Sequence, residues 1–229
     1  MRQPFLLRVW GIVLDEQLLT GLNLRIAQRT ILRMIDPGST VLDVGSGGGE
    51  LTKALSERGR CAVTAVEIDS DWVARAEPYA RKVVLGSIED DATWDAIQCE
   101  FDYVVFADVL EHLVDPWSVL RRCRGALKNG GRVLASIPNI AYYRVRQDLL
   151  LGRFDYVSAG ILDRTHLRFF TAKTVAALFS DSDYTLHQCE RVYTSAKNRL
   201  LAKISPNAFT YQFVVNAGPA VADGQMAVL

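Results

Sequence analysis

The sequence predicts a three-layered α/β fold, in which helices cover both faces of a largely parallel sheet. Short apolar runs alternate along the chain with segments of helical periodicity, as in repeated strand–helix–strand units. The intervening helices are long enough to cross over the sheet, so successive strands are expected to run parallel. Four glycines follow the first buried run at a strand-to-helix turn, which is where such folds bind ligands.

Composition limits the function classes. The chain of 229 residues fits one domain spanning 1–229, and its 26 basic residues equal its 26 acidic residues. No overall basic field exists to hold a nucleic acid, so we expect no nucleic-acid partner. The four cysteines form no CxxC pair, which argues against disulfides and against a zinc site and favours a cytoplasmic protein (Cys61, Cys99, Cys123, Cys189).

The N-terminal segment 1–36 is expected to be helical. "MRQPFLLRVWGIVL" resembles a signal peptide, but Arg8 interrupts its apolar run and no small-residue cleavage site follows. Apolar residues recur at helical spacing over 12–35, and "DPG" at 36–38 ends the helix. No stretch approaches the roughly 18 apolar residues of a membrane span, so no transmembrane segment is expected.

Seven strands and four further helices are expected in order. The strands are 40–44, 61–67, 82–86, 101–106, 131–137, 184–193 and 209–216, and the helices are 50–58, 70–80, 116–127 and 172–180. The helix at 116–127 has a clear start and stop, because Asp115 can cap it, Pro116 suits its first position and "NGG" follows it.

The C-terminal part departs from this alternation. The segment "SAKNRLLAKISPNAF" is too short and interrupted for a confident crossover helix, so the last two strands are expected to form an antiparallel edge. Residues 218–229 are predicted to be a disordered tail.

Residues 138–170 form an insertion between the fifth and sixth strands that we expect to cap the substrate. The insertion holds six aromatic residues and five arginines against three aspartates. About half of the aromatic side chains are expected to be core, and arginines usually form a solvated face. An arginine-rich segment facing the strand ends would also suit an anionic acceptor.

The glycine turn, "VLDVGSGGG", can be tested against known nucleotide sites. A P-loop needs GxxxxGK[ST], which is absent, and a dinucleotide fingerprint needs glycine or alanine where Glu50 stands. What remains is Asp43 followed by Gly45, Gly47 and Gly49. Alternating glycines let the backbone pass close to a ligand, and the acid can orient the loop or a ligand ammonium, which suits a zwitterionic sulfonium.

A second acid supports a nucleoside site. A nucleoside bound across adjacent strand ends needs a carboxylate at the tip of the second strand, about 20 residues on, for its ribose hydroxyls. Glu67 stands there in "AVEID", whereas Asp69 is better placed to cap the next helix.

Five motifs of the sequence resemble those of a known protein family. "VLDVGSGGG", "AVEID", "GSIEDD", "FDYVVFADVLEHL" and "ALKNGGRVLASIPN", in this order, resemble the class I S-adenosylmethionine-dependent methyltransferases over about residues 38–220. The resemblance implies a Rossmann-like seven-stranded sheet with the last strand inserted antiparallel, and S-adenosylmethionine as cofactor.

The resemblance also implies a set of cofactor-binding residues. Gly45 and Gly47 would line the methionine half, Glu67 would hold the ribose, and Ser87 with Ile88 would flank the adenine, although many relatives carry Asp where Ser87 stands. Asp108 would lie near the methionine amino group and the transferred methyl. The full expected set is Asp43, Gly45, Ser46, Gly47, Glu67, Ile68, Ser87, Ile88 and Asp108.

Within the family, "DVLEHLVDP", "LLLGRFDY" and "LDRTHLRFFT" resemble a bacterial subgroup that acts on small molecules and is often linked with polysaccharide synthesis. The sequence therefore predicts O-methylation of a sugar, glycan or other hydroxylated metabolite.

Methyl transfer from a sulfonium depends mainly on alignment and exclusion of water, and a general base is optional. If the acceptor is a hydroxyl, a histidine or carboxylate can remove its proton. The candidates are His112, beside Asp108, and His166 with Asp163 in "LDRTH"; His187 lies in a predicted edge strand and is taken as structural.

Other activities of this family are disfavoured. "ADVLEH" replaces the Asn-Pro-Pro or Asp-Pro-Pro-Tyr turn of enzymes that methylate amino groups of nucleic acids, and no Pro-Cys nucleophile is present. No Asn-Asp pair follows the fifth strand, so no metal is expected. A catalytically silent scaffold or cofactor-sensing subunit is the alternative, against which the intact glycines and Glu67 count.

Overall fold

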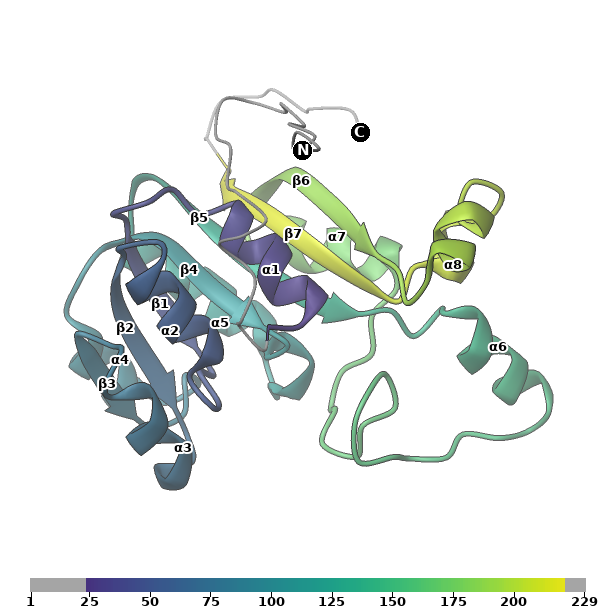
Figure 1. Ribbon diagram of the computed structural model, residues 1–229, viewed down its shortest axis with the longest axis horizontal. Coiled ribbons are helices and arrows are strands. Elements are labelled where there is room, and N and C mark those ends of the chain that lie inside the picture. The colour runs from purple at the N-terminus through teal and green to yellow at the C-terminus, as the bar shows by residue number, and fades with distance from the viewer. Residues whose placement is uncertain (1–23, 221–229) are drawn as a thin grey trace, which may run out of the picture.

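The computed structural model describes residues 24–220, which form a seven-stranded sheet between two helical layers (Figure 1). The strand order is β3-β2-β1-β4-β5-β7-β6. The strands are β1 (Thr40–Val44), β2 (Ala62–Glu67), β3 (Lys82–Leu85), β4 (Phe101–Ala107), β5 (Leu127–Pro138), β6 (Tyr184–Val192) and β7 (Gln212–Pro219).

The helices connect these strands in the expected alternation. The α-helices are α1 (Ile26–Arg33), α2 (Glu50–Glu57), α3 (Ser70–Ala76), α4 (Asp91–Ile97), α5 (Pro116–Cys123), α6 (Tyr143–Leu150), α7 (Ala172–Ser180), α8 (Ala196–Leu201) and α9 (Pro206–Phe209). Two short 3-10 helices, η2 (Leu110–His112) and η3 (Arg124–Ala126), flank α5.

The sheet topology confirms the predicted fold class. Strands β3, β2, β1, β4 and β5 pair in parallel, whereas β7 pairs antiparallel with both β5 and β6. The last strand is therefore inserted antiparallel between the fifth and the sixth. Neighbouring parallel strands end at the same edge, so the carboxyl ends of β1, β2 and β4 lie together.

Two hydrophobic cores lie on opposite faces of the sheet, because side chains alternate along each strand. Leu42 and Val44 of β1 join the core with residues of α4, α5 and α7, while Val41 joins the core with residues of α1 and α2. This places α1 and α2 on one face and α5 and α7 on the other. Nearly continuous burial of β1 and β4 is what a sheet covered on both faces requires.

Local capping follows the predicted chemistry. The Asp115 carboxylate accepts a hydrogen bond from the Ser118 backbone N–H at 3.0 Å, and Pro116 occupies the first turn of α5. Asp69 caps α3 by accepting from the Asp71 N–H at 2.8 Å.

Several predicted boundaries are wrong. The helix expected over 116–127 ends at Cys123. Strand β5 begins at Leu127, which pairs with Phe101 of β4, and continues through "NGG" to Arg132, which pairs with Tyr103 of β4. "NGG" therefore lies within a strand and does not end a helix. Helices α4, α6, α8 and α9 were missed. They are at most eight residues long, too short for a convincing periodic pattern.

The two chain ends are only partly described. Of the expected helical segment 1–36, residues 1–23 lie outside the described residues, and α1 covers Ile26–Arg33. Of the expected disordered tail, residues 221–229 likewise lie outside. The expectation is wrong for residues 218 and 219, because they pair with β6 as the end of β7.

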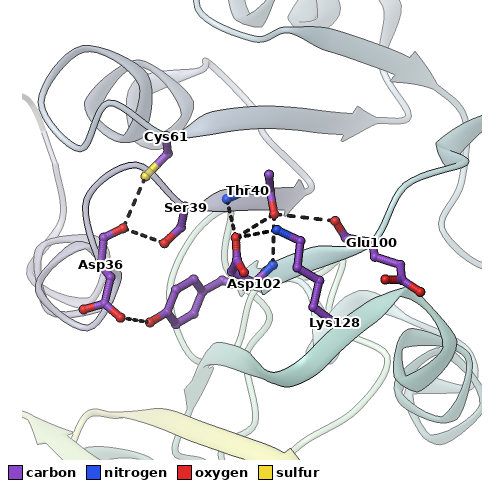
Figure 2. A network of polar contacts seen from close by, with 8 residues as sticks. Asp36, Ser39, Thr40, Cys61, Glu100, Asp102 and Lys128 are labelled. Carbon is purple, nitrogen blue, oxygen red and sulfur yellow. Dashed lines mark hydrogen bonds and ion pairs between the residues drawn. The ribbon is translucent and has the colours of Figure 1, made fainter.

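The amino-terminal edge of the sheet is closed by polar contacts (Figure 2). The Asp102 carboxylate accepts hydrogen bonds from the Thr40 N–H at 2.7 Å, the Thr40 hydroxyl at 2.8 Å and the Lys128 ammonium at 2.9 Å. Burial alone would raise the pKa of Asp102, but the bonds from Thr40 and Lys128 outweigh it and hold this pKa below its usual value. These contacts join the starts of β1, β4 and β5.

The insertion leaves the carboxyl end of β5 and projects past the sheet with α6 before returning to α7 (Figure 1). A bridge between Asn139 and Phe170 closes its base. The buried Asn139 amide donates to the carbonyls of Asn207 at 2.8 Å and Thr210 at 2.7 Å, which ties that base to the segment before β7. No helix in the described part of the chain has the length and apolar character that crossing a membrane requires.

Candidate active site

The glycine turn leaves β1 with three left-handed residues. The φ angles are 69° at Gly45, 51° at Gly47 and 77° at Gly49, a region that side-chain-bearing residues adopt at a cost. A Cβ on Gly45 would lie 2.6 Å from Cγ2 of Val109, so the turn touches the segment after β4. A Cβ on Gly47 would meet nothing within 4 Å, so this glycine faces open space.

Asp43 is a buried organiser of this turn. Its carboxylate accepts a hydrogen bond from the Thr52 hydroxyl of α2 at 2.6 Å, and the residue is 1% exposed. Burial raises the pKa of Asp43 to about 6, against the opposing effect of the Thr52 bond. The contacts thus favour the loop-orienting role over an ammonium-binding role.

Glu67, at the end of β2, forms a direct hydrogen bond with the glycine turn. One carboxylate oxygen accepts from the Gly47 N–H at 2.7 Å, and the other accepts from the N–H groups of Ile68 at 2.8 Å and Asp69 at 3.1 Å. A carboxylate has about four acceptor positions, so one remains for a further donor. Glu67 and Gly47, which are 20 residues apart in the sequence, are therefore in contact at the place where a ribose was expected to bind.

Ser46 carries an unpartnered buried hydroxyl. The residue is 8% exposed, and its Oγ makes no hydrogen bond with any described residue. Buried polar groups in native proteins are nearly always paired, so an orphan beside Gly47 points to a ligand group that completes it. The orphaned hydroxyl and the open face of Gly47 fit the methionine part of S-adenosylmethionine.

The predicted cofactor residues after β2 and β3 differ in exposure. Ile68, which was predicted to bind the cofactor without a stated part, is 71% exposed at the end of β2. The side chain of Ile88 is instead buried in the core with α5, and its carbonyl accepts from the indole N–H of Trp94 at 2.7 Å. The Ser87 hydroxyl accepts from the Glu89 N–H at 3.2 Å and so shapes the loop after β3.

Asp108 follows β4 in a left-handed conformation with φ of 62°. The Ser136 hydroxyl donates to its carboxylate at 2.7 Å, the Gln212 amide donates to the same oxygen, and Arg25 forms an ion pair with the other oxygen at 2.8 Å. Non-glycine residues in this conformation are uncommon and cluster at functional sites. A ligand ammonium at Asp108 would compete with Arg25, whose side chain is 65% exposed.

The two candidate histidines lie side by side. Their ring centroids are 4.7 Å apart in an edge-to-face arrangement, although His112 follows β4 and His166 ends the insertion. Burial first, and then the neighbouring His166, lower the pKa of His112. The backbone N–H groups of Leu167 and Arg168 both donate to the Glu111 carbonyl at 2.9 Å, which fixes the end of the insertion against η2.

Asp163 does not reach either imidazole by a hydrogen bond. Its carboxylate accepts from the backbone N–H of Thr165 at 2.9 Å and from the Thr165 hydroxyl at 2.7 Å, which hold the pKa of Asp163 below its usual value. This carboxylate shapes the turn that presents His166.

Glu111 was missed by the sequence analysis. It is 1% exposed, and neither carboxylate oxygen has a hydrogen-bond partner among the described residues. Burial first, and then the charge of Asp108, raise its pKa well above the usual value. A glutamate in a short loop is normally exposed to solvent, so nothing in the sequence predicted its burial. The only signal in the sequence that could have drawn attention to Glu111 was its place next to the candidate His112.

These features meet at the carboxyl edge of a sheet whose last strand is antiparallel. A glycine turn after β1 that is held by an acid after β2, with a further acid after β4, defines the class I S-adenosylmethionine-dependent methyltransferases. The particular family is shown by sequence comparison: residues 18–189 match the family model described as a methyltransferase domain, and the chain belongs to that family.

Curated relatives match only in part. Two proteins named ubiquinone biosynthesis O-methyltransferase, from Idiomarina loihiensis and Methylococcus capsulatus, are 36% and 37% identical to the chain over 106 residues. The matched region covers 44% of this chain and 43% and 44% of those relatives, so the chain spans less than half of their length in the alignment.

Solved structures share the fold at low identity. The CcbJ methyltransferase from Streptomyces caelestis has a TM-score of 0.60 at 14% identity, and the alignment covers 85% of this chain and 89% of CcbJ. The O-methyltransferase NcsB1 from neocarzinostatin biosynthesis, solved with S-adenosyl-L-homocysteine, has a TM-score of 0.54 at 19% identity over 84% of this chain and 53% of its own. The cofactor of this protein is S-adenosylmethionine.

Proposed function

We propose that this protein transfers the methyl group of S-adenosylmethionine to a hydroxyl group of a small-molecule acceptor. The observation that carries the proposal is the orphaned hydroxyl of Ser46 beside the open face of Gly47, on a turn held by Glu67. When bound, S-adenosylmethionine supplies an electrophilic methyl group on a sulfonium.

The residues of the chain divide the remaining work. Glu67 has one acceptor position left for a ribose hydroxyl, and Ser46 can pair with the polar end of the methionine part. The exposed Ile68 offers an apolar face to the adenine. His112, whose pKa is lowered by burial, is a neutral imidazole at neutral pH and is suited to receive the proton of an acceptor hydroxyl.

A hydroxylated ring is the acceptor that the comparisons favour. The two curated relatives are named for O-methylation in ubiquinone biosynthesis, and NcsB1 was solved with 1,4-dihydroxy-2-naphthoic acid. O-methylation of a sugar or glycan, as in the subgroup with "LDRTHLRFFT", stays a prediction. A cytoplasmic location of the protein likewise stays a prediction.

Fewer arginines of the insertion are available to bind an anionic acceptor than the sequence suggested. Arg153 is paired with Asp148 at 2.7 Å, and Arg168 donates to the carbonyl of Val114, so neither guanidinium is fully available. Arg164 is exposed and remains the best candidate for an acceptor anion. The test is Arg164→Gln, which should weaken binding of an acidic acceptor more at low salt than at high salt; equal affinity at both salt concentrations would remove this part of the proposal.

Cofactor binding is tested by isothermal titration with S-adenosylmethionine. Glu67→Gln should raise the dissociation constant by roughly tenfold or more, because a hydrogen bond to a charged group contributes about 1.5–3 kcal/mol. Glu100→Gln is the matched control, since Glu100 lies at the opposite edge of the sheet (Figure 2) and should bind as the wild type does. Absence of binding to the wild-type protein would overturn the proposal.

Turnover is tested separately with methyl-labelled cofactor and two matched acceptor panels, one of phenols and catechols and one of sugars and nucleotide-sugars. Label transfer to the first panel supports the proposal, and transfer only to the second supports the glycan prediction. Cofactor binding without label transfer to either panel would favour the silent scaffold over the enzyme.

A further inference from the structure

Three potential metal ligands converge beside the cofactor turn. Glu111 and His112 come from η2, and His166 comes from the end of the insertion. One ligand atom from each of the three residues lies within 4.8 Å of the other two. The segment that carries the first two begins at Val109, which contacts Gly45 of the glycine turn.

The two imidazoles are oriented as metal-binding histidines are. Nδ1 of His112 lies 3.2 Å from the carbonyl oxygen of Thr165, and Nδ1 of His166 lies 3.0 Å from that of Ile161. A carbonyl only accepts, so each Nδ1 carries the proton and each Nε2 presents a lone pair. Backbone carbonyls that fix the tautomer in this way are the usual outer shell of a metal site.

Glu111 supplies the independent observation. Its side chain is almost fully buried, yet both carboxylate oxygens lack a hydrogen-bond partner among residues 24–220. Arg25, whose positive charge acts on Glu111, forms its ion pair with Asp108 instead. Burying an unpaired carboxylate is costly, and native proteins pair such groups or use them to bind metals. Among the described residues, the structure therefore brings together a buried carboxyl group without a hydrogen-bond partner and two imidazoles whose Nε2 atoms are left to bind a ligand.

We propose that Glu111, His112 and His166 bind a divalent transition-metal ion that holds the acceptor hydroxyl; its catalytic part rests on the methyl transfer proposed above. Two imidazoles and one carboxylate suit Zn²⁺, Mn²⁺ or Fe²⁺ and leave positions open for substrate. With metal–ligand bonds of about 2.1 Å, a tetrahedral set has donor separations of about 3.4 Å, so ligand atoms as far apart as 4.8 Å would have to move together by more than about 1 Å on binding the ion.

The ion would lower the pKa of an acceptor hydroxyl bound to it. With its Nε2 on the ion, His112 would have no lone pair left to receive a proton, so in the metal-bound protein the hydroxyl proton would pass to solvent instead of to His112. The acceptor oxygen would form the new bond to the methyl carbon, and the carbon–sulfur bond would break with its electron pair returning to sulfur. The site differs from the Asn-Asp set sought in the sequence, and its third ligand arrives from a distant segment. For this reason no metal was expected from the sequence.

Metal binding is measured first, without cofactor, on chelator-treated full-length protein by calorimetric titration with Mn²⁺ and with Zn²⁺. Mn²⁺ is the decisive probe, because the exposed thiols of Cys99 and Cys189 bind Zn²⁺ but only weakly bind Mn²⁺. We expect one site for Mn²⁺ in the wild type, and on the order of 100-fold or greater loss of affinity in Glu111→Gln and His166→Asn.

The matched control is His187→Asn, which removes the one remaining histidine of the chain from the edge strand β6. This variant should bind Mn²⁺ as the wild type does. No Mn²⁺ binding by the wild type, or unchanged binding by a folded Glu111→Gln variant, would overturn the proposal.

Thermal unfolding gives a second readout that does not depend on activity. Mn²⁺ should raise the melting temperature of the wild type and of His187→Asn but not of Glu111→Gln. If Glu111→Gln fails to fold, His112→Asn takes its place. Mn²⁺ binding without methyl transfer would leave the metal site standing and remove the proposed function, whereas methyl transfer that proceeds unchanged without any Mn²⁺ binding would do the reverse.

Discussion

The buried carboxylate of Asp43 should make the stability of this protein fall as pH rises. Asp43 of β1 accepts a hydrogen bond from Thr52 of α2, and burial raises the pKa of Asp43 to about 6. In the unfolded chain the same carboxyl group ionises near its ordinary value of about 3.9. Between these two values the folded protein holds a proton that the unfolded chain has released.

The size of the effect follows from that difference. Stability contributed by the protonated group is fully present below about pH 4 and is lost as pH rises through about 6. Two pKa units correspond to about 3 kcal/mol of unfolding free energy. Asn cannot ionise, yet its amide oxygen can still accept from Thr52, so Asp43→Asn should remove the pH dependence and keep the contact.

The assay is urea unfolding of wild type and Asp43→Asn between pH 4 and 8, compared as a difference so that other titrating groups cancel. The variant should gain about 2–3 kcal/mol relative to the wild type from the lowest pH to the highest. Parallel stability curves would refute the reasoning.

Asp102→Asn is the matched control. The pKa of Asp102 is lowered in the folded protein, so its contribution is present above about pH 4 and is lost only at lower pH. The difference between this variant and the wild type should therefore stay constant from pH 5 to 8.

Four further substitutions test the fold by the same unfolding assay. Gly45→Ala should cost about 2–4 kcal/mol, because a Cβ there meets Val109 in addition to the left-handed backbone, whereas Gly47→Ala should cost only about 1–2 kcal/mol from the backbone alone; equal losses would refute the contact. Asn139→Ala should cost about 2 kcal/mol, because the buried carbonyl of Thr210 and the carbonyl of the exposed Asn207 both lose their donor, and a loss under 1 kcal/mol would mean that solvent replaces the amide. Tyr184→Phe should cost about 1 kcal/mol through the hydrogen bond to the carbonyl of Leu120, and no change would show that this hydroxyl contributes nothing.

The sequence predicted the sheet and the cofactor turn because their signals are local. Continuous apolar runs mark strands buried on both faces, and glycines at alternate positions mark a turn whose backbone needs positive φ. Gly45, Gly47 and Glu67 were placed correctly on elements, and Glu67 does contact Gly47 across two strands. The role of Asp43 was left between the loop and the ligand, and only its burial against Thr52 favours the loop.

Errors arose where pairing or packing overrides local preference. "NGG" was interpreted as a helix stop, yet it lies within β5. The short helices of the insertion and of the segment before β7 carry too few turns to show a period.

The sequence by itself determined the fold class, the family resemblance and the cofactor turn. The fold class depends on the alternation of apolar periods along the chain, the resemblance on the order of five motifs, and the turn on residue types at fixed spacing in one strand–turn–helix unit. Only the tertiary structure decided which side chains share the reaction edge. It brought His166 from the end of the insertion against His112, paired Arg25 with Asp108 and buried the Glu111 carboxyl group without a hydrogen-bond partner among residues 24–220. Those contacts depend on how the insertion and α1 pack against the sheet, and spacing along the chain carries no information about such packing.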